Sequence, residues 1–209
     1  MNLSDYDFRD LFQKCVIIKA DHIFSGAQDV LSDQSYSTLQ DMDAALCYCY
    51  IDPTHGITFH FLCTAIFETG AIDQYSYEKI VDAGVVLMFR AGPAFEIYPY
   101  TGDVSPFRAR IDMVEENYHK DKNVLPTRSI TKIDHLRHDC NPDDILAVLY
   151  KDGLELERPW VRLTEINDGK LYGVLINEPH QDFGVHYQDN VQIIIAEHEG
   201  QIYAVINII

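Results

Sequence analysis

The chain has 209 residues, of which 47% are hydrophobic and 23% charged, as is ordinary for a soluble globular protein with one large domain or two small ones. Sixteen Lys and Arg stand against thirty-three Asp and Glu, so the formal net charge is −17 and the pI is about 4.7. This acidic excess argues against nucleic acid and against a membrane surface as partners, and it would attract a basic protein.

The start of the chain and its cysteines indicate a cytoplasmic protein. No stretch approaches the ~18–20 apolar residues that span a bilayer, and the N-terminus lacks the basic and then apolar layout of a secretion signal. The cysteines are odd in number and scattered, which is typical of reduced, buried thiols in a chain without an export signal (Cys15, Cys47, Cys49, Cys63 and Cys140).

The first part of the chain is predicted to mix helices with a sheet. Residues 4–15 are typical of a helix, because Ser4 can cap it, Asp7 follows three residues later, and one side is apolar (Phe8, Leu11, Phe12 and Cys15). Residues 15–24 fit either a continuation of this helix or a strand. Residues 25–41 have no long periodic segment, so we expect a loop with a short helix there.

The clearest signal in this half is a hairpin. Residues 44–51 and 57–67 are apolar runs separated by the turn sequence Asp-Pro-Thr-His-Gly. Because both faces of these strands are apolar, we expect them to lie centrally in a covered sheet. Cys47 and Cys49 are expected to be buried thiols, and His60 a strand residue with a hydrogen-bond partner.

Further elements follow the hairpin. Asp73 as N-cap and Gly84 as stop predict a helix between them, and two more strands are expected at residues 85–90 and 95–100. Residues 105–120 alternate as a strand would, but they also carry a helical stripe (Phe107, Ile111, Val114 and Tyr118). The pair Ser105-Pro106 favours the helix, because it supplies a cap and a first-turn proline.

The last part of the chain is almost continuous strand. Residues 119–129 are polar and interrupted by Pro126, which makes them the best boundary candidate, and residues 130–138 suit a short helix. Five short runs then follow in residues 144–208, separated by turns that contain glycine. We therefore predict an α+β fold, in which residues 1–128 form a mixed or antiparallel sheet with helices and residues 129–209 form a small, strongly curved β-sheet or SH3-like barrel.

A distinctive order of residues runs through residues 144–195. An acidic residue and a Trp-Val pair precede an alternating strand, and then come a glycine turn, a G-x-L-x-N-x-P strand and a later Asp (Glu157, Trp160, Val161, Gly169, Gly173, Leu175, Asn177, Pro179 and Asp189). This order resembles the bacterial domain of unknown function 2314, although "HYQDN" stands where that family often has K-x-G-D. The resemblance covers about the last third of the chain, and it implies a bacterial protein and a fold rather than an activity.

These residues also have structural explanations. Asp168 and Gly169 supply the positive φ of a tight turn, Gly173 permits a bulge, and Pro179 ends a strand. Trp160 suits a half-buried core residue whose indole N–H needs an acceptor. These residues therefore favour a well-formed β-hairpin over a binding site.

Two clusters could carry chemistry. On a helix, His135 and His138 would share a face beside Cys140, as a zinc-ligand set or a Cys–His nucleophile pair, but the anions nearby disfavour a thiolate and exposed polar residues are the favoured interpretation. The loop 177–189 gathers histidines and carboxylates with aromatic residues between two strands. Its spacing favours a solvated connection with Phe183 packed inward.

The sequence predicts a non-enzymatic module that binds another protein with one end of the C-terminal sheet. Its binding candidates are Glu157, Trp160, Asn177, His180, Asp182, Phe183 and His186. One version is an acidic antidote that masks a basic toxin. The alternatives are a metal-dependent or Cys/His hydrolase that uses the 177–189 loop, and a structural accessory domain. We assign no cofactor, metal ligand or catalytic residue, because phosphate cradles and hydrolase motifs are absent from the sequence. The oligomeric state is left open.

Overall fold

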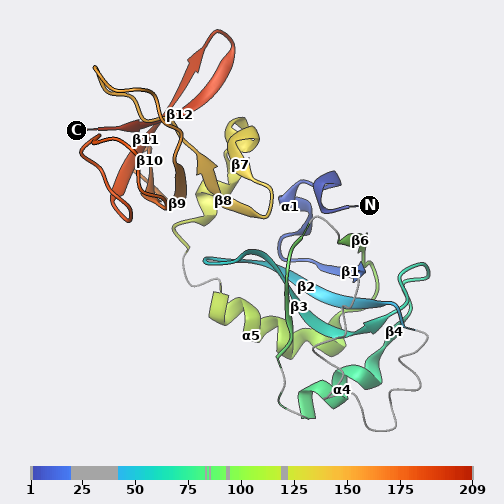
Figure 1. The fold of residues 1–209 in the computed structure, drawn as a ribbon. Coiled ribbons are helices and arrows are strands. Elements are labelled where there is room, and N and C mark those ends of the chain that lie inside the picture. The colour runs from blue at the N-terminus through green and yellow to red at the C-terminus, as the bar shows by residue number, and fades with distance from the viewer. Residues whose placement is uncertain are drawn as a thin grey trace. The chain divides into compact units, whose positions relative to one another are not determined.

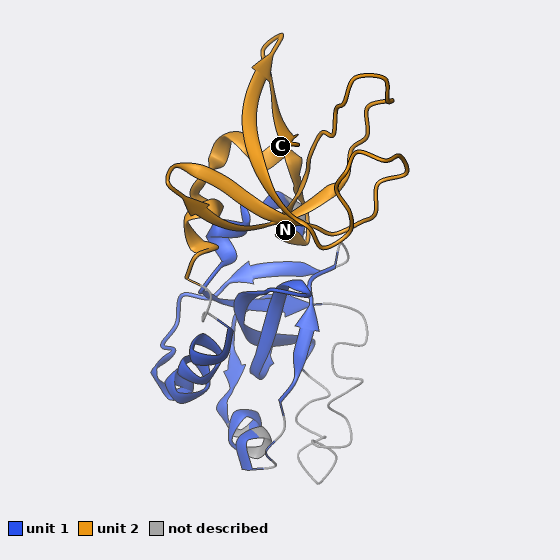
Figure 2. Ribbon diagram, turned by 90° about the vertical axis from the view of Figure 1, so that its left-hand side faces the viewer, with its two compact units in different colours: residues 1–120 blue, residues 121–209 orange. Residues whose placement is uncertain are grey.

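The computed structural model describes residues 2–19, 42–82, 84, 86–92, 95–118 and 122–208. They form an α+β fold with two compact units, residues 1–120 and 121–209, and each unit is built round a strongly curved antiparallel sheet (Figures 1 and 2). The units divide at 120/121 rather than at 128/129, because Arg128 and the turns around it belong to the second unit. Within the described residues, no helix has the length and hydropathy needed to cross a membrane.

The first sheet has the strand order β4–β3–β2–β1–β6, with β5 beside β3. Its strands are β1 (Cys15–Lys19), β2 (Ala44–Asp52), β3 (Gly56–Ala65), β4 (Ile72–Asp73), β5 (Met88–Arg90) and β6 (Glu96–Pro99). All of β3 and all but the last residue of β2 are buried, so the hairpin is central, as its apolar faces predict. The next two strands are shorter than expected, and they lie on opposite sides of β2, because β5 pairs with β3 and β6 with β1.

The predicted helix at residues 4–15 is wrong. The structure has a 3-10 turn (Leu3–Asp5), a one-turn helix α1 (Phe8–Leu11), and then β1. The carboxylate of Asp7 accepts a hydrogen bond from the backbone N–H of Arg9 and starts α1 at that point. The helix ends at Leu11, because Phe12 (φ −59°, ψ 129°) has already left the helical conformation, and Gln13 then adopts a left-handed φ of 59° before β1 begins at Cys15. The predicted loop and helix at 25–41 lie outside the described residues.

Two helices accompany the first sheet. Helix α4 (Gln74–Asp82) follows Asp73 directly, and Gly84 beyond its end has a φ of +67°. Helix α5 (Arg108–Tyr118) continues from a 3-10 turn that contains Pro106, as the helical interpretation predicts. Ile111 and Val114 of α5 pack on the sheet face that carries Leu46, Tyr48 and Tyr50.

His60 differs from its prediction. It lies on β3 opposite Tyr48 and is 1% exposed. Neither ring nitrogen has a hydrogen-bond partner among the described residues, so the expected partner is missing. Burial, followed by the charge of Arg110, lowers the pKa of His60 to about 4. The ring is therefore held neutral in the folded chain.

The second sheet has the order β12–β11–β10–β9–β8–β7, in which every neighbouring pair is antiparallel. Its strands are β7 (Arg137–His138), β8 (Asn141–Leu146), β9 (Trp160–Asn167), β10 (Lys170–Leu175), β11 (Asn190–His198) and β12 (Gln201–Asn207). The sheet curves far enough for Val148 to accept a hydrogen bond from the N–H of Ile206 (2.9 Å) and to donate one to the carbonyl of Ala204 (2.7 Å). The strongly curved sheet predicted for this part is confirmed.

Turn residues set the register of this sheet. Asp168 and Gly169 (φ 48° and 74°) and Glu199 and Gly200 (φ 52° and 77°) form the two-residue turns that join β9 to β10 and β11 to β12. At Gly173 the pairing with β9 shifts by one residue, as expected for a bulge. A Cβ there would lie 2.5 Å from Cγ1 of Val161, so only glycine fits.

Ion pairs fix the start of the unit to its sheet. Arg128, in the 3-10 turn Leu125–Ser129, donates from Nε and Nη2 to both carboxylate oxygens of Asp143, at 2.9 and 2.7 Å. Arg162 on β9 makes the same two-pronged contact with Asp144 on β8. The short helix expected within residues 130–138 is a 3-10 helix, Thr131–Leu136.

Candidate functional site

The strand directions place the connections of the second unit at two opposite ends. Tight turns at residues 139–140, 168–169 and 199–200 lie at one end, because each joins neighbouring antiparallel strands. The long connections, residues 147–159 and 176–189, lie together at the other end, and Figure 2 shows them as two strandless loops. We call these two segments the two-loop end.

The first loop is a short hairpin without a regular strand. Leu149 and Glu157 exchange two backbone hydrogen bonds of 2.9 and 3.1 Å, which close the loop at its base. The turn is made at Gly153, whose φ of +85° favours glycine. This base positions Glu157 beside the second loop.

The second loop is anchored in the core. Phe183 is fully buried among the core residues of the unit, and Pro179 is also buried. Phe183 was a predicted binding residue, and this assignment is wrong, because a side chain with no exposed surface cannot contact a partner. The inward packing that its spacing favours is what the structure shows.

The carboxylate of Glu157 joins the two loops. It accepts hydrogen bonds from the backbone N–H of His180 (2.8 Å) and of Gln181 (2.9 Å), and from the side-chain amide of Gln181 (3.0 Å). These hydrogen bonds, led by the one from His180, lower the pKa of Glu157. The imidazole Nδ1 of His180 is 3.3 Å from the same carboxylate, while most of that ring is exposed.

A second carboxylate organises the far side of the loop. Glu178 accepts hydrogen bonds from the backbone N–H of Tyr187 (2.6 Å) and pairs with Nδ1 of His186 (2.9 Å). These contacts lower the pKa of Glu178 and, through the hydrogen bond to Glu178, raise that of His186. Asp189 accepts from the N–H of His186 at 2.7 Å. The acidic side chains thus hold the backbone of the loop in place.

Trp160 and Asn177 have structural contacts. The side-chain oxygen of Asn177 accepts the backbone N–H of Trp160 at 2.6 Å, which ties the end of β10 to the start of β9. Trp160 is half-buried, and its ring meets that of His138 at 5.4 Å between centroids. Asn177 therefore shapes the site rather than presenting itself to a partner.

The histidines do not converge. His180 pairs with Glu157 and His186 with Glu178, whereas Asp182 accepts from the N–H of Gly184. His135 contacts the carbonyl of Ile202, and His138 lies in β7, so these two do not share a helix face. In the part of the chain that the structure describes, no three His, Cys, Asp or Glu side chains are grouped as metal ligands.

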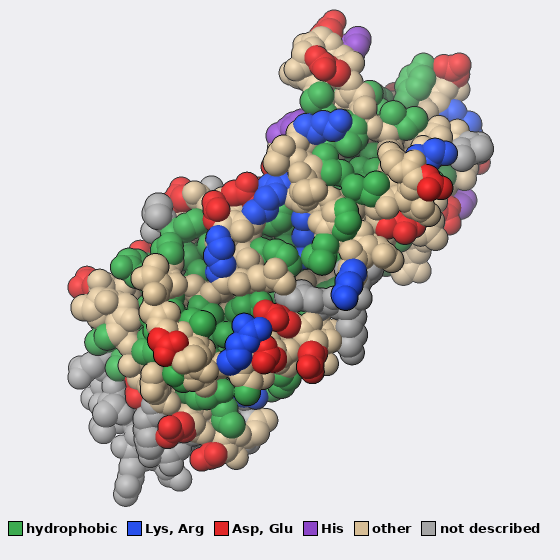
Figure 3. Space-filling model, turned by 180° about the vertical axis from the view of Figure 1, so that it is seen from behind, with side chains coloured by type: hydrophobic (Ala, Val, Ile, Leu, Met, Phe, Trp, Pro, Cys, Tyr) green, Lys and Arg blue, Asp and Glu red, His purple; other side chains and the backbone are tan. Residues whose placement is uncertain are grey.

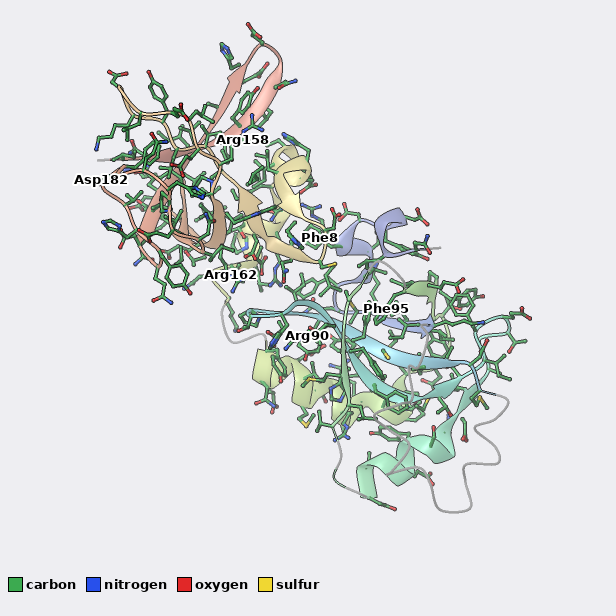
Figure 4. The ribbon with its side chains drawn as sticks, viewed as in Figure 1. Phe8, Arg90, Phe95, Arg158, Arg162 and Asp182 are labelled. Atoms are coloured by element: carbon green, nitrogen blue, oxygen red, sulfur yellow. The ribbon has the colours of Figure 1, made fainter. Side chains whose placement is uncertain are left out.

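The two-loop end presents apolar side chains between acidic ones. Tyr150, Leu156 and Tyr187 are 60%, 54% and 53% exposed. Four carboxylates accompany them on the same loops (Asp152, Glu155, Glu178 and Asp182), and all four are exposed. Figure 4 shows Asp182 on the outer loop of the unit, and Figure 3 shows hydrophobic and acidic side chains side by side on the molecular surface. Neither Tyr150 nor Leu156 is among the binding residues predicted from the sequence, although both are large apolar residues beside a glycine turn.

Comparison of the chain with models of known protein families, with curated proteins and with solved structures finds no match. The resemblance of residues 144–195 to the domain of unknown function 2314 therefore stays a prediction.

Proposed function

We propose that the protein is a non-enzymatic interaction module whose two-loop end binds a basic segment of another protein. The observation that carries the proposal is the exposure of Tyr150, Leu156 and Tyr187 among carboxylates on loops that are already fixed by internal hydrogen bonds. An aromatic and apolar centre with a polar rim is the usual composition of a protein-binding surface.

The electrostatics support the same kind of partner. Residues 121–209 contain fifteen Asp and Glu and eight Lys and Arg, a formal charge of −7. Among these cations, Arg128, Arg137 and Arg162 are already paired with carboxylates inside the unit. A basic partner would be attracted over this surface, and the attraction would weaken as salt screens it. Masking of a basic toxin by an acidic antidote is one form of this function.

Rigid loops favour affinity. Ordering a mobile loop on binding costs free energy, and a loop that is ordered beforehand avoids that cost. The contacts of Glu157 and Glu178 already hold the second loop, and Lys151 adds contacts of 3.4 Å to the carbonyls of Asp182 and Phe183. Glu157 and Glu178 therefore fix the shape of this surface and also contribute to its negative charge.

The test uses the whole protein and two fluorescein-labelled peptides, one with several Arg and Lys spaced by Leu and Tyr, and one in which the basic residues are replaced by Gln. Fluorescence anisotropy over a series of NaCl concentrations should show binding of the basic peptide that weakens with salt. The double variant Tyr150→Ala/Leu156→Ala should weaken binding about tenfold. The matched control Ile166→Ala/Ile194→Ala removes two exposed apolar side chains from strands and should leave binding unchanged. Equal binding of the two peptides, or equal losses in both double variants, would overturn the proposal.

A further inference from the structure

A cavity of about 440 Å³ lies in the first unit, between the start of β1, helix α5 and the segment that joins β6 to α5. Its volume is within the ~300–1,000 Å³ of ordinary small-molecule sites. Much of its wall is apolar or aromatic (Leu11, Cys15, Val16, Tyr48, Tyr100 and Ile111). All of these residues belong to one unit, so the cavity is complete within residues 1–120.

Gly102 has a specific part in the wall. A Cβ at this position would lie 2.4 Å from the hydroxyl oxygen and 2.5 Å from Cζ of Tyr100. The ring of Tyr100 therefore rests directly on the backbone of Gly102, and a larger residue at 102 would displace it. The half-buried Tyr100 ring is held as one face of the cavity by this contact.

Some of the charged side chains at the cavity are paired with other residues of its wall or of helix α5. Glu115 accepts the hydroxyl of Tyr48 (2.7 Å) on one oxygen and Nη2 of Arg108 (3.3 Å) on the other. The same Nη2 of Arg108 is 2.6 Å from Asp112. The carboxylate of Glu115 thus has a partner on each oxygen within the wall.

Two side chains of opposite charge at the cavity have no partner among the described residues. Asp10 and Lys14 both line it and both are exposed, and neither side chain has a hydrogen bond or an ion pair with any of the described residues. An anion and a cation beside an apolar cavity complement a ligand that carries one charge of each sign next to an apolar group. Recognition by charge-assisted hydrogen bonds would orient such a ligand.

We propose that this cavity binds a free α-amino acid with an apolar or aromatic side chain. The ammonium group of the ligand pairs with Asp10, its carboxylate pairs with Lys14, and its side chain lies against the accessible lining residues Pro99, Tyr100 and Val104. The site is independent of the two-loop end, because all of its residues lie in the other unit.

Three related probes test the ligand class in NMR titrations of the isotope-labelled full chain. L-Phenylalanine carries both charges, 3-phenylpropionate lacks the ammonium, and 2-phenylethylamine lacks the carboxylate. L-Phenylalanine should bind at least about tenfold more tightly than either analogue, with amide shifts that centre on Cys15, Gly102 and Ile111. Equal affinity for all three probes, no saturable shifts, or shifts centred elsewhere would overturn the proposal.

Charge variants separate recognition from loss of the fold. Lys14→Gln should weaken L-phenylalanine about tenfold and leave the weak binding of 2-phenylethylamine unchanged. Asp10→Asn should also weaken the binding of L-phenylalanine, but it should leave the weak binding of 3-phenylpropionate unchanged. Lys132→Gln and Asp82→Asn, at exposed positions outside the cavity wall, are the matched controls and should have no effect. Unfolding would abolish binding of all probes alike, so this crossed pattern belongs to charge recognition, and its absence would refute the assignment of the two charges.

Discussion

His60 provides a sharp test of the core of the first unit. Its ring is 1% exposed, has no hydrogen-bond partner among the described residues, and has a pKa of about 4 instead of the ordinary 6.5. Between pH 6.5 and 4 the unfolded chain therefore binds a proton at this position and the folded chain does not. The free energy of unfolding falls as the pH drops through this window, and the loss is complete below the folded pKa.

The magnitude follows from the difference between the two pKa values. A difference of about 2.5 units corresponds to about 3 kcal/mol in all, of which about 2 kcal/mol is lost between pH 7.5 and pH 5.0. A second effect acts at every pH, because a buried polar group without a partner costs about 1–3 kcal/mol. His60→Leu removes both effects while keeping a similar volume. We therefore expect this variant to be about 1 kcal/mol more stable at pH 7.5 and about 3 kcal/mol more stable at pH 5.0.

Urea unfolding at the two pH values measures these differences. The only tryptophan, Trp160, is in the second unit, so its fluorescence follows that unit while far-UV circular dichroism follows both. The fluorescence transition should be the same in the variant and the original chain. His198→Leu removes a histidine whose side chain is 78% exposed and serves as the control. The reasoning about His60 is refuted if His60→Leu is less stable at pH 7.5, or if its advantage does not grow at pH 5.0.

Two further predictions concern the second unit, and Trp160 fluorescence in urea measures both. Asp143→Asn takes the carboxylate away from the buried guanidinium of Arg128 and should lower the free energy of unfolding by about 3 kcal/mol, whereas Arg128→Met/Asp143→Leu should recover most of the loss. A double variant as unstable as the single one would contradict this account. Gly173→Ala should lower the free energy of unfolding by about 2 kcal/mol, because its Cβ would lie 2.5 Å from Val161 and 2.6 Å from the carbonyl oxygen of Arg162. Gly184→Ala meets open space and has only its φ of +83° against it, so it should cost about 1 kcal/mol, and equal losses at the two glycines would contradict the close approach at Gly173.

The strands could be predicted where the pattern of apolar residues along the chain matches the burial of those residues in the folded unit. The β2–β3 hairpin is apolar on both faces because it is covered on both faces, and the turns Asp168-Gly169 and Glu199-Gly200 each place a glycine at the positive φ that it favours. The N-terminal helix failed for the opposite reason. Its apolar spacing is correct for a helix, but the backbone leaves the helical conformation at Phe12 and turns at Gln13, and neither residue type signals this in the sequence.

The position of the candidate site could be predicted from the sequence, but the roles of its residues could not. The gathered polar residues of the loop 177–189 identify it, yet Glu157, Glu178 and Asn177 each accept a hydrogen bond from a backbone N–H group. Every residue except proline offers such a donor, so no choice of side chain in the sequence indicates which one is bound. The carboxylates therefore suggested chemistry, and the structure shows them holding the loops.

The apolar residues of the loops carry more information than the polar ones. The open end of a curved sheet needs side chains to close its core, and Phe183 fills that position completely while Leu154 packs partly against the same core. Tyr150, Leu156 and Tyr187 are then not needed for closure, and each is more than half exposed. Single exposed apolar residues are common, but these three lie on two loops that hydrogen bonds join. Phe183 is buried in the core and closes it, whereas Tyr150, Leu156 and Tyr187 remain exposed and can contact a partner. This difference in burial is the reason for proposing the interaction at the two-loop end.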